Sequence, residues 1–218
     1  MKKIKRYSAL RRTLDILSMV IYRHREYYSP INGRITVTTI LGAHDVETNS
    51  IQQNGPYLEG MWRSSIENIR RHAPAEIREI LMLGLGGGQG VRIFQEHFPN
   101  SNITVIEYDR TMIEIALELH QFNQTLPVKI IEGDAQLKID TLPSSYDFVI
   151  MDLFTPDAPS NLGGDEHFLN QIKRVLTEEG IMIANVYDHH QYLDTMEHVF
   201  QRLELWKYQT NHLGIFSK

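Results

Sequence analysis

The sequence predicts an α/β protein built on a mostly parallel sheet, and two patterns in its second half carry that prediction. Five short apolar runs alternate with stretches of helical periodicity, which is typical of βαβ units whose strands are buried on both faces. Two strand-like runs then follow at 203–208 and 212–216, separated by a polar break, and they predict an antiparallel hairpin. We therefore expect a seven-stranded sheet with flanking helices.

The elements of this sheet follow one another in regular order. The apolar runs are Ile80–Leu83, Ile103–Ile106, Val128–Ile131, Phe148–Met151 and Ile181–Val186. Helical spacing marks residues 89–98, 110–121, 165–177 and 190–202, and a short helix is expected at 135–139. Five βα units followed by an antiparallel hairpin are the pattern of a class I methyltransferase-like (Rossmann-like) fold.

The first 72 residues are expected to form a small helix-plus-strand appendage to a main domain over residues 73–218. Apolar side chains recur every three or four positions over 4–21, which predicts an amphipathic helix. The β-branched run at 35–41 predicts a strand, and the polar segment 42–56 reads as a loop with room for a short strand around Val46. Residues 57–72 look helical.

Composition excludes several classes of function. The 218 residues include no cysteine, which rules out thiol catalysis, disulfide scaffolds and cysteine–zinc sites. The apolar fraction of 42% is ordinary for a globular protein. Because no apolar run approaches the ~20 residues of a membrane span, we expect a cytoplasmic protein without a membrane anchor.

The net charge of −5 is unevenly distributed. Residues 1–30 carry eight Lys or Arg and two acids, a balance of +6 that leaves −11 for the rest of the chain. An acidic body argues against broad nucleic-acid binding, which depends on neutralising phosphates, and it suits a cationic small substrate. We expect the basic N-terminal helix to dock on the body or on a second copy, so a homodimer is the expected assembly.

A glycine-rich loop joins the first parallel strand to the helix after it. Its glycines allow a tight turn and a close approach to a ligand; they are Gly84, Gly86, Gly87, Gly88 and Gly90. A nicotinamide-binding Gly-x-Gly-x-x-Gly pattern that opens on Gly84 would need a glycine where Gln89 stands. No Lys-Ser/Thr follows, as a phosphate loop requires, and no Gly-x-Ser-x-Gly marks a serine hydrolase.

Acidic residues follow the next three strands. Glu107 comes 21 residues after Gly86, where a carboxylate can accept hydrogen bonds from ribose hydroxyls. Asp109 is expected to cap the next helix, while Asp134 either meets the exocyclic amine of an adenine or caps a helix of its own. Asp152 ends the fourth strand. Since ligands of open α/β sheets bind at the carboxyl ends of the strands near the topological switch point, we expect one shared crevice.

The stretch from Ile80 to about Tyr187 resembles the polyamine aminopropyltransferases (spermidine synthases) and their spermidine-synthase-like methyltransferase relatives. The matching segments are Gly86–Gly90, Val105–Asp109, Gly133–Ala135, Tyr146–Asp152 and Phe168–Val186. The resemblance implies a sulfonium donor, S-adenosylmethionine or its decarboxylated form, and no metal. Glu107 would hold the ribose and Asp134 the adenine. The implied cofactor-binding set is Gly84, Gly86, Gly87, Gly88, Gln89, Glu107, Asp134, Ala135 and Asp152.

The departures from that family fall where the acceptor would bind. Gln89 replaces the Asp of the family's Gly-Gly-Gly-Asp-Gly, and Thr155 replaces the second Asp after the fourth strand. Asp152 remains and is the expected catalytic base. Because a dicationic amine needs carboxylates around it, these changes indicate an altered acceptor site. The candidate acceptor-binding residues are Tyr57, Glu59, Thr155, Asp157 and Tyr187.

The expected activity is methyl transfer from S-adenosylmethionine to an unidentified small acceptor, for which an amine is suitable. Aminopropyl transfer from the decarboxylated donor is the alternative, and a non-catalytic nucleoside-binding or scaffold protein is the second alternative. The sequence Asp188-His189-His190 reads as a polar loop, because adjacent histidines do not share a helix face as a helical zinc motif requires.

Overall fold

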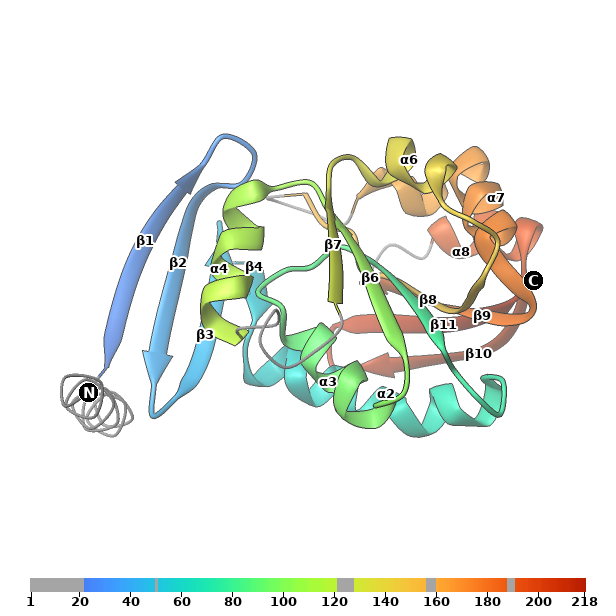
Figure 1. Ribbon diagram of the computed structural model, residues 1–218, viewed down its shortest axis with the longest axis horizontal. Helices are drawn as coiled ribbons and strands as arrows, with labels where there is room; N and C mark the ends of the chain where they lie inside the picture. The colour runs from blue at the N-terminus through green and yellow to red at the C-terminus, as the bar shows by residue number, and fades with distance from the viewer. Residues whose placement is uncertain (1–21, 50, 121–127, 156–159, 188–190) are drawn as a thin grey trace, which may run out of the picture.

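The computed structural model describes residues 22–49, 51–120, 128–155, 160–187 and 191–218 (Figure 1). The amphipathic helix expected over 4–21, the candidate Asp157 and the loop 188–190 lie outside the described residues. Within those ranges, no helix is both long enough and apolar enough to cross a membrane.

The large sheet has the predicted class I methyltransferase-like topology. Its strand order is β10-β11-β9-β8-β5-β6-β7, in which β5 to β9 are parallel and β11 is antiparallel to both of its neighbours. The strands are β5 (Glu79–Leu83), β6 (Asn102–Glu107), β7 (Val128–Glu132), β8 (Tyr146–Met151), β9 (Leu176–Tyr187), β10 (Gln201–Tyr208) and β11 (Asn211–Ser217). Because the chain adds β6 and β7 on one side of β5 and then returns to β8 on the other, the topological switch lies between β5 and β8.

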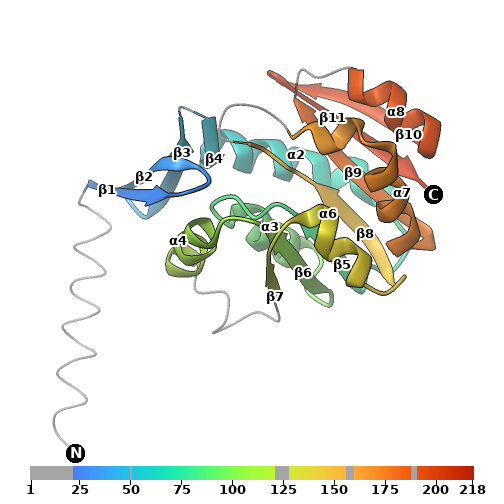
Figure 2. The same ribbon diagram turned by 90° about the horizontal axis from the view of Figure 1, so that it is seen from above.

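Helices cover both faces of this sheet, as the continuous apolar strands require. On one face lie α2 (Pro56–His72), α3 (Gln89–His97) and α4 (Arg110–His120), and on the other lie α6 (Ala135–Lys138), α7 (Glu166–Val175) and α8 (Gln191–Val199) (Figures 1 and 2). The described residues also form two short 3-10 helices, η1 (Ile139–Thr141) and η2 (Asn161–Gly164). Successive residues of β5 join opposite cores. Ile80 and Met82 pack with α2 and α3, whereas Leu81 and Leu83 pack with α6 to α8.

A second sheet of four strands precedes the large one, where the sequence predicted a strand over 35–41 and a loop with room for a short strand around Val46. Its strands pair in consecutive antiparallel order and are β1 (Arg23–Ser29), β2 (Gly33–Ile40), β3 (Ala43–Thr48) and β4 (Ile51–Asn54). β3 confirms the short strand expected around Val46. The expectation of a loop was wrong for β4, whose four residues, three of them only partly buried, lack the apolar run of a buried strand.

Helix α4 lies between the two sheets. Ile35, Val37 and Val46 of the small sheet are fully buried against Met112 and Ile115 of α4. Polar contacts at the ends of this interface add to the packing, since Tyr27 Oη donates to Glu118 at 3.0 Å and Asn32 Nδ2 donates to Asp109 Oδ2 at 2.6 Å. The small sheet is thereby held over the carboxyl ends of β5 and β6 (Figure 2). The boundary at residue 72 stays a prediction, and α2, which precedes it, packs on the large sheet.

Candidate active site

Two cavities meet at the carboxyl ends of β5 and β8, which is the topological switch point. The larger has a volume of about 360 Å³ and the smaller about 80 Å³. Four residues line both: Gln53, Gly86, Asp152 and Phe154. A ligand that extends from one cavity into the other would therefore pass Asp152 and the glycine-rich loop.

The small cavity brings together five of the nine residues that the sequence assigned to the donor, whereas Gly87, Gly88 and Asp134 line neither cavity. Gly84, Glu107, Gly133 and Ala135 line it, each at the end of a parallel strand. The exposed ring of Tyr108 also lies along its wall. Glu107 and Asp152, which the sequence placed in one crevice with Gly86, thus line the same cavity.

Glu107 is held rigidly at the end of β6. Its Oε2 accepts a hydrogen bond from the backbone N–H of Leu85 at 2.8 Å, and its Oε1 accepts one from the N–H of Asp109 at 2.8 Å. Burial raises the pKa of Glu107, and these backbone donors oppose that rise by favouring the ionised form. The carboxylate also ties the β5–α3 loop to β6. Each of its oxygens has a second lone pair that can accept from a ribose hydroxyl.

The other two acids of this edge act as helix caps. Asp109 Oδ1 accepts from the N–H of Thr111 at 2.8 Å, which confirms its predicted capping of α4. Asp134 Oδ1 accepts from the N–H of Gln136 at 2.8 Å and caps α6. Asp134 stands between two residues that line the small cavity, Gly133 and Ala135. Its contact with an adenine stays a prediction.

The glycine-rich loop is packed against β4 as well as facing the cavities. Gly86 has φ +52°, and a Cβ added there would lie 2.6 Å from the carbonyl oxygen of Gln53. The next N–H along, that of Gly87, donates to the same carbonyl at 3.0 Å. The small sheet therefore reaches the loop directly, and these glycines are needed for the approach of β4 in addition to any ligand.

Gly86→Ala is expected to destabilise the fold more than Gly42→Ala, a matched control in the β2–β3 turn. Gly42 also has positive φ, +80°, but a Cβ there meets nothing within 4 Å. Both changes add left-handed backbone strain of roughly 1–2 kcal/mol, and only Gly86→Ala adds a clash, worth about 1–3 kcal/mol more. Chemical denaturation measures the difference. Equal losses in the two variants would mean that β4 does not press on the loop.

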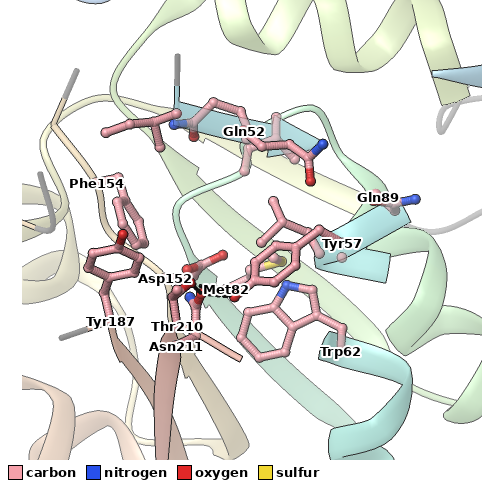
Figure 3. A pocket seen from close by; sticks show the side chains of 16 residues that line it. Gln52, Tyr57, Trp62, Met82, Gln89, Asp152, Phe154, Tyr187, Thr210 and Asn211 are labelled. Atoms are coloured by element: carbon pink, nitrogen blue, oxygen red, sulfur yellow. Dashed lines mark hydrogen bonds between the residues drawn. The ribbon is translucent and has the colours of Figure 1, made fainter. Parts of the chain in front are cut away.

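Among the described residues, the large cavity is walled by aromatic rings around one carboxylate, that of Asp152. Tyr57 and Trp62 of α2 lie on one side of Asp152, and Phe154 and Tyr187 lie on the other (Figure 3). The rings of Phe154 and Tyr187 meet edge to face with centroids 6.4 Å apart. No Lys, Arg or His is among the described residues that line this cavity. Such a site suits a cation, because aromatic faces and a carboxylate both attract positive charge.

Asp152 is the ionisable group at the centre of this arrangement. It follows β8, and its Oδ1 accepts from Asn185 Nδ2 at 2.9 Å. Burial raises the pKa of Asp152 to about 6, and the Asn185 hydrogen bond partly offsets the rise. A carboxylate with a pKa near 6 is ionised at neutral pH and can exchange a proton with a nearby group, which is what a general base requires.

Two other predicted acceptor residues lie away from this cavity. Glu59 points to the far side of α2, where it accepts from Arg63 Nε at 2.9 Å, from Gln89 Nε2 at 2.9 Å and from Arg92 at 3.3 Å. Thr155 is exposed and does not line the cavity. Tyr57 and Tyr187, in contrast, line the cavity, and the acceptor-binding roles of all four residues stay predictions.

Gln89 lines the large cavity, but its carboxamide has structural partners. Its Oε1 accepts from the N–H of Gly55 at 3.0 Å, and its Nε2 donates to Glu59. The side chain points away from Asp152 (Figure 3). It therefore holds the junction between β4 and α2, and it supplies no charge to the cavity.

Sequence reasoning missed three residues that build the site. Gln53 of β4 lines both cavities, Asn185 contacts Asp152, and Asn211 lines the large cavity from the start of β11. One signal was available for Asn185, since it is the polar residue within the apolar run Ile181–Val186. The other two are brought to the site by tertiary packing alone.

Comparison with known proteins agrees with this fold. Residues 78–214 match a family model described as a methyltransferase domain. Over 117 residues the chain is 32% identical to the eEF1A lysine and N-terminal methyltransferase of Mus musculus, covering 49% of this chain and 17% of that protein. Over 120 residues it is 31% identical to a polyamine aminopropyltransferase of Vibrio vulnificus, covering 50% of this chain and 40% of that protein. The chain thus spans less than half the length of these two relatives.

Solved structures extend the likeness to the small sheet. A spermidine synthase in complex with the transition state analogue AdoDATO superposes with a TM-score of 0.73 at 17% identity, covering 90% of this chain and 74% of that one. At this identity the match shows a shared fold. The family model spans more than half of the sequence and includes every parallel strand, the glycine-rich loop, Glu107 and Asp152. The chain therefore belongs to the methyltransferase domain family.

Proposed function

We propose that the protein transfers the methyl group of S-adenosylmethionine to an amine. The observation that carries the proposal is the carboxylate of Asp152, set among aromatic rings where the two cavities meet. The nucleoside would occupy the small cavity beside Glu107, and the acceptor would enter the large one. The donor's sulfonium would then lie beside Asp152 and Gly86, which line both cavities.

The reaction is a displacement at the methyl carbon. A neutral amine nitrogen attacks that carbon, a C–N bond forms, the C–S bond breaks, and its electrons remain on the sulfur of S-adenosylhomocysteine. An amine arrives protonated at neutral pH and has no free lone pair, so Asp152 accepts a proton from it. The aromatic walls and Asp152 hold the nitrogen in line with the C–S bond.

Charge balance supports methyl over aminopropyl transfer. The decarboxylated donor carries an ammonium in addition to its sulfonium, and a diamine acceptor retains a second ammonium when one nitrogen attacks. Only two carboxylates, Asp152 and Glu107, line the cavities in the described ranges. In S-adenosylmethionine the donor's own carboxylate neutralises its ammonium, so fewer buried charges need protein partners.

Calorimetry with the two donors tests the proposal. We expect S-adenosylmethionine to bind more tightly than its decarboxylated form, because the described cavity walls offer no third carboxylate for the extra ammonium. Methyl transfer would then be measured with labelled donor against primary amines and lysine-containing peptides. Tighter binding of the decarboxylated donor would contradict the proposal, and binding of neither would favour a scaffold.

Aminopropyl transfer is the second candidate, because a polyamine aminopropyltransferase matches half of this chain at 31% identity. Putrescine with the decarboxylated donor is the discriminating assay, following release of the thioether nucleoside. Turnover on the order of 1 s⁻¹ or faster, as in a working enzyme, would establish this reading in place of methyl transfer.

A further inference from the structure

A chain of buried amides lies behind the Asp152 carboxylate. Asn185 near the end of β9 and Asn211 at the start of β11 are each only 3% exposed. Buried amides are costly unless they are hydrogen-bonded, and both of these are. Asn211 Nδ2 donates to Asn185 Oδ1 at 2.8 Å, and Asn185 Nδ2 donates to Asp152 Oδ1 at 2.9 Å.

The orientation of both amides is fixed by groups whose hydrogen-bonding role is unambiguous. The backbone N–H of Tyr187 can only donate, and it lies 3.2 Å from Asn185 Oδ1. The other end of that amide, the NH₂ group, must therefore face Asp152. Asn185 Oδ1 also receives Asn211 Nδ2, so Asn211 Oδ1 faces away from Asn185 and accepts from the hydroxyl of Tyr57.

These hydrogen bonds consequently all point the same way: Tyr57 of α2 donates to Asn211 of β11, Asn211 donates to Asn185, and Asn185 donates to the Asp152 carboxylate. We propose that Asn185, held by Asn211 and Tyr57, is a positioning residue that keeps the Asp152 carboxylate ionised and turned toward the cavity. Its consequence for turnover rests on the proposed function, whereas its effect on Asp152 itself does not.

The surroundings of Asp152 make this donor important. Among the described residues, the titratable side chains that share its cavities are the phenols of Tyr57 and Tyr187, with the phenol of Tyr108 and the carboxylate of Glu107 on the nucleoside side. None of the described lining residues is cationic. The Asn185 amide is therefore a neutral means of stabilising a buried negative charge, and it leaves the full charge of Asp152 for the acceptor.

The direct test is an NMR titration of the Asp152 carboxyl carbon in the whole protein, assigned by its loss in Asp152→Asn. Asn185→Leu removes the donor with little change in volume, and we expect the Asp152 pKa to rise by about one pH unit, as for loss of a hydrogen bond to an ionised group. Asn211→Leu leaves Asn185 anchored by the Tyr187 N–H alone, so we expect a smaller rise. Asn170→Leu on the exposed face of α7 is the control and should leave the pKa unchanged.

The titration separates positioning from a merely structural role. If Asn185 and Asn211 only stabilise the fold, their variants lower the melting temperature while the Asp152 pKa stays at the wild-type value, and the proposal is overturned. Should Asn185→Leu fail to fold, the Asn211→Leu titration decides in the same way. Because no donor or acceptor is added, absence of methyl transfer would contradict the proposed function and leave this result intact.

Discussion

Asp152→Asn is expected to lower the rate of amine methylation by about 10²–10⁴-fold at neutral pH, the usual effect of removing a general base. The amide retains the size and the hydrogen bonding of the side chain but can neither accept the proton nor neutralise the ammonium. Initial rates of labelled methyl transfer measure the loss. Asp140→Asn, which changes an exposed carboxylate of η1, is the matched control and should leave the rate of methyl transfer unchanged.

The methylation rate is also expected to depend on pH in a definite direction. Burial raises the pKa of Asp152 to about 6, so the group is ionised above that pH and protonated below it. The methylation rate of the wild-type protein should therefore fall as the pH is lowered, with an apparent pKa near 6. The residual rate of Asp152→Asn should not show this fall. Full activity in the Asn variant would remove Asp152 from the mechanism.

Glu107→Ala is expected to weaken binding of the S-adenosyl donor by roughly 10- to 150-fold, which corresponds to ~1.5–3 kcal/mol for hydrogen bonds to a charged group. The change removes the proposed ribose acceptor and also leaves the N–H groups of Leu85 and Asp109 without their present partner. Calorimetric titration measures the affinity.

Two comparisons sharpen the Glu107 prediction. Glu114→Ala removes an exposed carboxylate of α4 that pairs with Arg110, and it should leave donor affinity unchanged. Asp134→Asn should weaken binding less than Glu107→Ala, because an amide oxygen can still accept from the adenine amine. Donor affinity within twofold of wild type in a folded Glu107→Ala protein would show that the ribose binds elsewhere.

The large sheet was predictable because burial on both faces leaves continuous apolar runs, as in β5 and β8. Two strands of the small sheet, β1 and β4, were missed for the opposite reason. β1 alternates exposed and partly buried positions and carries charged Arg23, Arg25 and Glu26, so its sequence resembles a polar segment. Its existence depends on pairing with β2 and on cover from α4, and neither is local to its own residues.

The donor side of the site was more accessible to sequence reasoning than the acceptor side. Glu107 and Asp152 stand at the ends of recognisable strands, and strand ends converge by topology. Glu59 was assigned because Tyr57-Leu58-Glu59 stands roughly where the resembling family has a Tyr-His-Glu motif, but residues two apart on a helix point in different directions. Tyr57 accordingly lines the cavity, and Glu59 meets Arg63.

The position of α4 between the two sheets also constrains the order of folding. The strands of the small sheet are synthesised before α4, yet Ile35, Val37 and Val46 have their apolar partners in Met112 and Ile115. A few antiparallel strands with one apolar face uncovered are marginally stable and offer free edges to other chains. The small sheet therefore stays incompletely packed until β5, β6 and α4 have been synthesised, so that formation of the large sheet completes the packing of the small one.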